Sequence, residues 1–155
     1  MDFTTQIFCA PGRYVQGAGA IHEIGAHVAP LGGSILVVGG RTGLTATRAG
    51  RRKSFEAQHI RYIEESFNGE TSDAEIERLA ALCKQTCCDV LMASGGGKVI
   101  DAVKAAAEEI DVPAVVVPTV ASNDAPCSAL TVVYNPDGTF SRLRPLKKNP
   151  ALVLV

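Results

Sequence analysis

Three short runs of consecutive apolar residues most constrain how this chain can fold. They lie within residues 34–38, 89–93 and 114–117, and glycine or proline follows each one within two residues. Runs that are apolar at successive rather than alternate positions are typical of strands buried on both faces. We therefore predict a sheet that is covered by helices on both sides.

Helical patterns separate these strands. Ser72 and Glu75 fit a capping box, and apolar residues at helical spacing continue from there to about Thr86. A second helix is predicted over residues 99–109, ending before Pro113, because proline disfavours helical geometry in the residue before it. This alternation predicts an α/β fold with a doubly wound, mostly parallel sheet.

Weaker segments complete the predicted fold. Residues 59–63 alternate in polarity and fit an edge or half-buried strand. Residues 130–134 and 139–142 flank the turn signal Asn135-Pro136-Asp137-Gly138, which predicts an antiparallel hairpin. Residues 152–155 predict a last strand, and because natural domains rarely end inside a buried strand, we expect the chain to be a fragment of a longer protein.

The composition fits a single globular domain. The chain has 155 residues, of which 46% are hydrophobic, and 15 basic residues balance 16 acidic ones. The near-zero net charge argues against nucleic acid as a partner. No apolar run reaches the roughly 18 residues of a membrane span, and the N-terminus lacks a signal-peptide pattern, so neither a membrane nor secretion is predicted.

The five cysteines are a poor disulfide framework, because their number is odd and three crowd between positions 83 and 88. Cys83 and Cys87 are four residues apart and are expected to share one helix face. We predict buried, reduced thiols and a cytoplasmic location. A metal site is the alternative, but His22, His27 and His59 show no matching spacing.

A basic cluster lies between positions 41 and 53. It is predicted to be a solvated helix face, with phosphate contact or a subunit interface as alternatives. Its members are Arg41, Arg48, Arg51, Arg52 and Lys53.

Two polar loops follow predicted strands. Residues 94–98, Ser-Gly-Gly-Gly-Lys, connect a strand to a helix, where glycines let backbone N–H groups approach a phosphate. The loop matches neither the Walker A nor the G-x-G-x-x-G pattern, and a plain glycine connection with a solvated lysine is the alternative. Residues 118–128 offer hydroxyls, an amide and a carboxylate, although turn-forming preferences alone could explain them. Their shared sheet edge favours a nucleotide site.

Together, the segment Gly95-Gly96-Gly97-Lys98-x-x-Asp101 and the segment from Pro118 to Leu130 resemble the glycerol dehydrogenases of the iron-containing, metal-dependent alcohol dehydrogenase superfamily, which is related to dehydroquinate synthase. The resemblance covers essentially the whole chain. It implies a Rossmann-like dinucleotide-binding domain over residues 1–155, and it implies that an all-helical, metal-binding C-terminal domain is absent from this chain.

The resemblance also assigns roles. Gly96, Gly97 and Lys98 match the pyrophosphate loop, Asp101 the carboxylate near the nicotinamide carboxamide, and Asp124 a contact to the substrate hydroxyls. Thr119 and Ser122 match hydroxyls on the adenine and ribose side. The full set of cofactor-binding residues implied in this way is Gly40, Gly96, Gly97, Lys98, Val99, Ile100, Asp101, Thr119, Val120, Ala121, Ser122, Ser128, Leu130 and Tyr134.

The implied activity is NAD-linked oxidation of a secondary alcohol of a small polyol, most like glycerol to dihydroxyacetone, in a homo-oligomeric enzyme. Zinc or iron would polarise the substrate oxygen, with one Asp and two His ligands outside this chain. Two departures stand out. Gly40 and then Arg41 replace an acid that holds the adenosine ribose, which is compatible with NADP, and Asn123 replaces a Ser or Thr.

Two alternative functions stay open. The first is a glycerol-1-phosphate dehydrogenase of the same superfamily, for which the nearby basic candidates are Arg142, Arg144, Lys147 and Lys148. The second is a non-catalytic NAD(P)-binding module, if the chain is complete.

Overall fold

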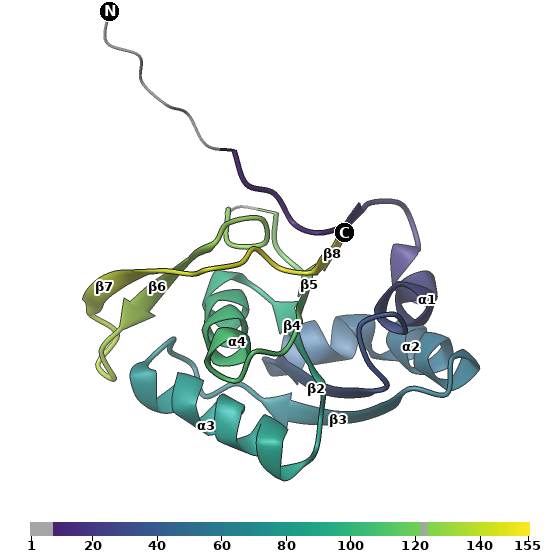
Figure 1. The fold of residues 1–155 in the computed structure, drawn as a ribbon, viewed down its shortest axis with the longest axis horizontal. Helices are drawn as coiled ribbons and strands as arrows, with labels where there is room; N and C mark the ends of the chain where they lie inside the picture. The colour runs from purple at the N-terminus through teal and green to yellow at the C-terminus, as the bar shows by residue number, and fades with distance from the viewer. Residues whose placement is uncertain (1–7, 122–123) are drawn as a thin grey trace, which may run out of the picture.

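The computed structural model describes residues 8–121 and 124–155, and its centre is a six-stranded parallel sheet (Figure 1). The strand order is β1-β8-β5-β4-β2-β3. The strands are β1 (Tyr14–Val15), β2 (Ser34–Gly39), β3 (Arg61–Ser66), β4 (Val90–Gly95), β5 (Ala114–Pro118) and β8 (Leu152–Leu154). All three apolar runs are therefore central strands, and residues 61–66 form an edge strand, as predicted.

Helices cover both faces of the sheet. The short 3-10 helix η1 (Ala20–Glu23), α1 (Ile24–Val28) and α2 (Arg41–Ala57) pack on one face, and α3 (Asp73–Gln85) and α4 (Gly97–Glu109) on the other (Figure 1). Within β2, Ile35 and Val37 join the core beneath α1 and α2, whereas Leu36 and Val38 join the core beneath α3 and α4. This arrangement confirms the doubly wound, Rossmann-like α/β prediction.

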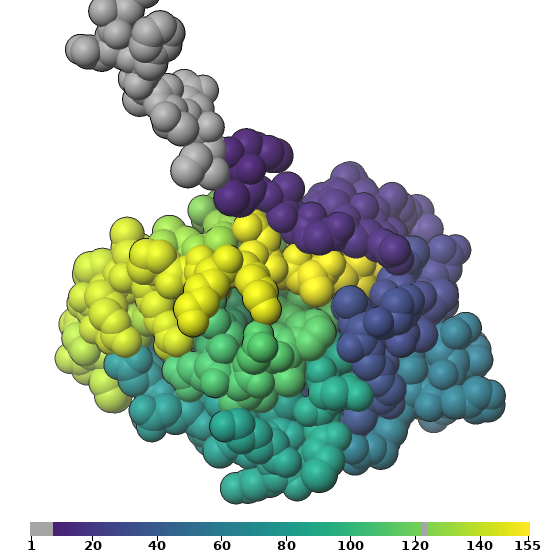
Figure 2. All heavy atoms as spheres, viewed as in Figure 1, coloured from purple at the N-terminus to yellow at the C-terminus, as the bar shows by residue number. Residues whose placement is uncertain are grey.

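The predicted hairpin forms a separate two-stranded antiparallel sheet of β6 (Leu130–Tyr134) and β7 (Phe140–Pro145). It packs beside α4, and Arg142 anchors it to the start of α3 through an ion pair with Asp73 at 2.6 Å. The chain then returns to the sheet through β8. In Figure 2 the purple N-terminal segment lies across the yellow C-terminal one, where the N–H group of Gly12 donates to the carbonyl of Pro150.

The predicted cap of α3 forms only in part. The Ser72 hydroxyl accepts a hydrogen bond from the N–H group of Glu75, as in a capping box. The Glu75 carboxylate does not reciprocate; it accepts hydrogen bonds from Asn68 and Arg78 instead. The carboxylate thereby ties the loop before α3 to the helix itself.

The three long helices end alike, each on a residue other than glycine in the left-handed conformation. These residues are His59, Cys87 and Asp111, with φ near +50°. At Cys87 the N–H group donates to the carbonyl of Lys84, and that of Cys88 donates to Cys83, the pair of bonds that defines a Schellman motif. The same pair of bonds follows α2 and α4.

Three predictions about side chains need correction. Cys83 and Cys87 do not share a helix face, because α3 ends at Gln85 and the chain then turns through Cys87. Only Cys83 and Cys88 are buried, while Cys9, Cys87 and Cys127 are exposed, although all five thiols are free. The basic cluster is not a uniformly solvated face, since Arg51 is fully buried.

Within the described residues, no helix combines the length and the apolar character that crossing a bilayer would require.

Candidate functional site

The candidate site lies where the chain leaves two neighbouring strands in opposite directions. β2 and β4 are adjacent, with Gly39 opposite Ser94 at their carboxyl ends. From these ends β2 continues into α2 on one face of the sheet, and β4 continues into α4 on the other face (Figure 1). Such a divergence opens a crevice at the sheet edge, and ligands of open α/β sheets bind there.

Both helices present N-termini without side-chain caps to this edge. α2 begins after Gly40 and α4 after Gly96, and neither helix has a side-chain cap or an acidic residue in its first turn. In contrast, the Ser72 hydroxyl caps α3. The first N–H groups of a helix need acceptors, and the helix dipole favours negative charge there, so two uncapped N-termini at one edge suit an anionic ligand.

The glycines at this edge fall into two groups. A Cβ atom added to Gly40 or Gly96 would meet nothing within 4 Å, so the space before these two turns is open. A Cβ atom at Gly39 or Gly43 would instead clash with the carbonyl oxygen of Ser94, so these glycines allow the end of β2 and the start of α2 to lie directly against β4. The residues present therefore fit a pyrophosphate that approaches the backbone closely.

A buried hydrogen-bond network supports the crevice from beneath. The Ser94 hydroxyl donates to the carbonyl of Gly43, and the Thr47 hydroxyl accepts from the guanidinium of Arg51 at 2.6 Å. Arg51 also pairs with Glu64 of the edge strand β3. Burial lowers the pKa of the Arg51 guanidinium, while the Glu64 carboxylate beside it acts in the opposite direction.

Lys98 lies in the first turn of α4, and its ammonium group makes two interactions. It pairs with the Glu70 carboxylate at 2.5 Å and sits 5.3 Å from the centre of the Tyr134 ring. The side chain is 48% exposed, so its charge remains accessible to a ligand. The structure thus brings Lys98 and Tyr134 together, two of the residues that the sequence assigns to the cofactor.

Asp101 is buried in the second turn of α4. One carboxylate oxygen accepts a hydrogen bond from the N–H group of Val132, and the other lies 3.0 Å from the ammonium nitrogen of Lys104. Burial raises the pKa of Asp101 and lowers that of Lys104. In this structure the carboxylate connects α4 to β6. Val99 and Ile100, beside it in the sequence, are buried in the helix.

The polar loop after β5 begins beside the glycine loop, because the N–H group of Thr119 donates to the carbonyl of Gly95. A cavity of about 340 Å³ opens at this edge. It is lined by Tyr14, Pro118, Thr119, Val120, Ala121, Pro126, Cys127 and Val155. Asp124 is exposed, and its backbone carbonyl accepts the N–H groups of Cys127 and Ser128. Ser122 and Asn123 lie outside the described residues.

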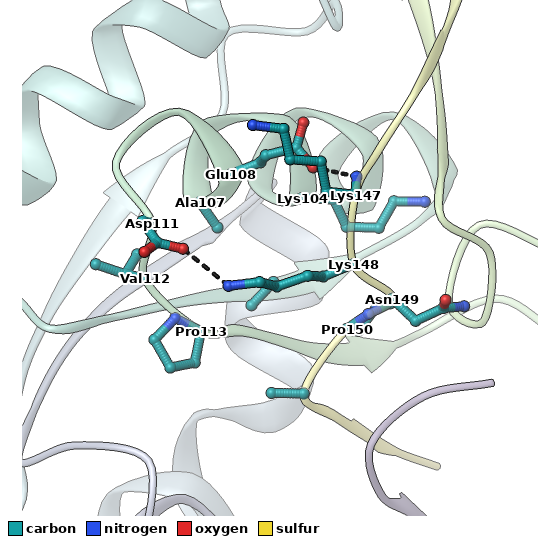
Figure 3. A pocket seen from close by; sticks show the side chains of 12 residues that line it. Lys104, Ala107, Glu108, Asp111, Val112, Pro113, Lys147, Lys148, Asn149 and Pro150 are labelled. Atoms are coloured by element: carbon teal, nitrogen blue, oxygen red, sulfur yellow. Dashed lines mark hydrogen bonds and ion pairs between the residues drawn. The ribbon is translucent and has the colours of Figure 1, made fainter. Parts of the chain in front are cut away.

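A larger cavity, of about 590 Å³, lies elsewhere, between the end of α4, the start of β5 and residues 147–151 (Figure 3). Its acids and bases partner one another: Lys148 pairs with Asp111 at 2.9 Å, and the Glu108 carboxylate accepts the backbone N–H group of Lys147. It opens at the amino end of β5, away from the crevice, although two of its lining residues, Lys104 and Asn149, bond to the loop after β5.

Sequence reasoning missed the supporting roles of Lys104, Thr47 and Ser94. Lys104 follows Asp101 by three residues on an alanine-rich face, and a lysine at such a position was the available signal. Thr47 and Ser94 gave no comparable signal.

Among the described residues, no three His, Cys, Asp or Glu side chains gather where they could hold a metal ion. The family resemblance implies ligands outside this chain.

Comparison with known proteins agrees with this fold. The chain is 39% identical over 150 residues to a glycerol dehydrogenase of Escherichia coli and 44% identical over 152 residues to one of Thermotoga maritima. The two matches include 97% and 98% of this chain, respectively, but only 41% of the length of each relative. The structure of a probable glycerol dehydrogenase from Sinorhizobium meliloti superposes on this one with a TM-score of 0.85 and 35% sequence identity. The match includes 97% of this chain and 40% of the Sinorhizobium chain. Residues 11–155 match the model of the iron-containing alcohol dehydrogenases, and the chain belongs to that family.

Proposed function

We propose that this chain supplies the dinucleotide-binding part of a metal-dependent, NAD(P)-linked dehydrogenase that oxidises a secondary alcohol of a small polyol, most like glycerol to dihydroxyacetone. The observation that carries the proposal is the pair of uncapped helix N-termini at the divergence of β2 and β4. The names of the relatives supply the substrate class: glycerol dehydrogenases match nearly the whole chain, and the chain spans about 40% of their length.

We assign the residues along the crevice to successive parts of the dinucleotide. Gly96, Gly97 and Lys98 would hold the pyrophosphate, with Val99 and Ile100 continuing the turn. Gly40 would lie beside the adenosine ribose. Thr119, Val120, Ala121 and Ser122 would line the adenine and ribose side, while Asp101, Ser128, Leu130 and Tyr134 would lie along the nicotinamide half. The nicotinamide, when bound, accepts a hydride from the alcohol carbon. Asp124 would orient the polyol through its hydroxyls.

We expect the metal ligands to lie outside residues 1–155. The expected ion is zinc or iron. The proposal also places the enzyme in the cytoplasm, in keeping with five free cysteines, and treats it as a homo-oligomer.

Glycerol 1-phosphate is the less favoured substrate. Three of the bases that the sequence offers for a phosphate have acidic partners of their own: Arg142 pairs with Asp73, Arg144 with Glu109 and Lys148 with Asp111. A phosphate would have to compete with these carboxylates. A glycerol-1-phosphate dehydrogenase of Methanothrix thermoacetophila also matches less of the chain, at 32% identity over 135 residues.

Titration of the 155-residue chain with NADH tests the binding part of the proposal, using the increase in nicotinamide fluorescence. Gly96→Val, which fills open space before α4, should abolish binding while the chain stays folded. Gly33→Val is the matched control, because a Cβ there also meets nothing and the position lies at the opposite end of β2. Equal binding by both variants would contradict the proposed site.

The activity is tested on the complete enzyme that contains this chain, by following NADH formation from glycerol with and without added zinc or iron. The absence of metal-dependent NADH formation from any small diol or polyol would overturn the proposed reaction. The same assay with glycerol 1-phosphate as competitor separates the two substrate classes.

A further inference from the structure

Lys104 is a buried lysine that the proposed chemistry does not use. It lies in the middle of α4 and is 3% exposed. Its ammonium nitrogen lies 3.0 Å from the Asp101 carboxylate and within hydrogen-bond distance of oxygens in a single loop: the carbonyls of Ala125 at 2.8 Å, Ser128 at 3.2 Å and Leu130 at 2.5 Å, and the Ser128 hydroxyl at 3.4 Å.

These acceptors span the second half of the loop that joins β5 to β6. Ala125 directly follows Asp124, and Leu130 begins β6. An ammonium group has three hydrogens and a full charge, so it can hold several carbonyls that converge on it, whereas an apolar side chain of the same length would leave those carbonyls unpaired in a buried place. The loop therefore depends on Lys104 for its closure onto α4.

The turn inside the loop extends this effect to Asp124. Its carbonyl accepts the N–H groups of Cys127 and Ser128, so its backbone is fixed relative to residues that Lys104 holds. Asp101 reinforces the arrangement, since it pairs with Lys104 and accepts the N–H group of Val132 in β6. One buried ion pair thus fixes the loop and the first strand of the hairpin to the helix that begins with the glycine loop.

We propose that Lys104 is a positioning residue: by binding the carbonyls of residues 125–130, it fixes Asp124 where that carboxylate meets the polyol. This inference rests on the proposed function for the role of Asp124. The fixing of the loop itself stands on the contacts alone, so the two parts can be tested apart.

Amide hydrogen exchange in the 155-residue chain tests the loop. Lys104→Met should speed exchange in residues 125–132 by at least tenfold and leave β2 and β4 unchanged. Lys53→Met, an exposed lysine on α2, is the matched control and should change neither region. If Lys104→Met does not fold, Lys104→Gln, which keeps an amide donor, should give an intermediate increase. Exchange as slow as in the unmodified chain, in a folded variant, would overturn the inference.

Kinetics of the complete enzyme test the link to substrate. The same variants should raise KM for glycerol at least tenfold. KM for NAD should rise several-fold less, because only the nicotinamide half of the proposed cofactor site, at Asp101, Ser128 and Leu130, touches Lys104, whereas the pyrophosphate and adenosine contacts do not. General loss of folded protein cannot produce such a split. Faster loop exchange with an unchanged KM for glycerol would overturn the role in substrate positioning. An unmodified enzyme that oxidises no polyol would instead contradict the proposed function. The exchange result would still decide whether Lys104 fixes the loop to α4.

Discussion

The hydroxyl oxygens of Thr47 and Ser94 lie 2.8 Å apart and join α2 to the carboxyl end of β4, directly beneath the crevice. Ser94 also donates to the carbonyl of Gly43 in the first turn of α2. The position of the α2 N-terminus, which lies at one side of the proposed pyrophosphate site, thus depends on a buried side chain of the strand that carries the glycine loop.

Replacing Ser94 with alanine should therefore lower the free energy of unfolding by about 1–3 kcal/mol, because a buried polar partner is lost. Dinucleotide binding should weaken as well, since α2 loses its anchor to β4. Urea unfolding and an NADH titration measure the two effects. Ser141→Ala on the exposed strand β7 is the control and should alter neither quantity. Unchanged stability of Ser94→Ala would contradict the structural role given to this hydroxyl.

The Glu64 carboxylate should make stability depend on pH. Its pKa lies below its ordinary value of 4.5, chiefly because Arg48 donates hydrogen bonds to it, with the charge of Arg51 also contributing. A carboxylate with a lowered folded-state pKa stabilises the protein above the unfolded-state pKa, and this contribution disappears as the pH falls through the folded-state value.

Glu64→Gln should thus lower the free energy of unfolding by about 2 kcal/mol at pH 7, as expected for hydrogen bonds to a charged group, and by progressively less below pH 4.5. Urea unfolding at a series of pH values gives the comparison. Glu77→Gln, at an exposed position of α3, is the control, and its stability should not approach that of the unmodified chain in this way as the pH falls. A difference that stays constant down to pH 3 would rule out this ion cluster as the cause.

The Schellman motifs offer a direct gain in stability. Cys87 adopts φ of +51°, a conformation that costs residues with a Cβ atom about 1 kcal/mol and glycine almost nothing. Cys87→Gly should raise the free energy of unfolding by about 0.5–1 kcal/mol, whereas Cys87→Ala keeps the Cβ atom and should not. Chemical denaturation of both variants distinguishes the backbone effect from loss of the thiol. Equal stabilities of Cys87→Gly and Cys87→Ala would refute the backbone effect.

The strands could be predicted because their burial on both faces leaves a local pattern: residues 35–38 are apolar and all of them lie in the core. The end of α3, predicted at about Thr86, falls at Gln85, but the left-handed turn at Cys87 could not be predicted, because no glycine marks it. The partners of Arg51 and Lys104 could not be predicted from local patterns. These partners, Glu64 and the carbonyls of residues 125–130, come into reach only when α2 packs beside β3 and the loop closes onto α4.

Glu70 should weaken dinucleotide binding, because its carboxylate pairs with Lys98 and would oppose an incoming phosphate. Glu70→Gln frees the ammonium group and should tighten NADH binding by about two- to fivefold, the range expected for a solvent-screened pair. The advantage should shrink in high salt. Glu23→Gln, which is remote from this edge, is the control. Weaker binding by Glu70→Gln would mean that Glu70 positions Lys98 rather than competing for it.

Gly40 and Arg41 should set the preference between NAD and NADP. Gly40 is the N-cap of α2 and faces open space, no acid lies in the first turn, and exposed Arg41 follows it, so nothing there repels a 2′-phosphate. Gly40→Asp places a carboxylate at this N-cap, where it also suits the helix. We expect NADPH binding to weaken at least tenfold and NADH binding to persist, as measured by parallel fluorescence titrations. Arg41→Gln should weaken NADPH alone, and to a smaller extent. If Gly40→Asp weakened both nucleotides equally, the adenosine ribose would lie elsewhere than beside α2.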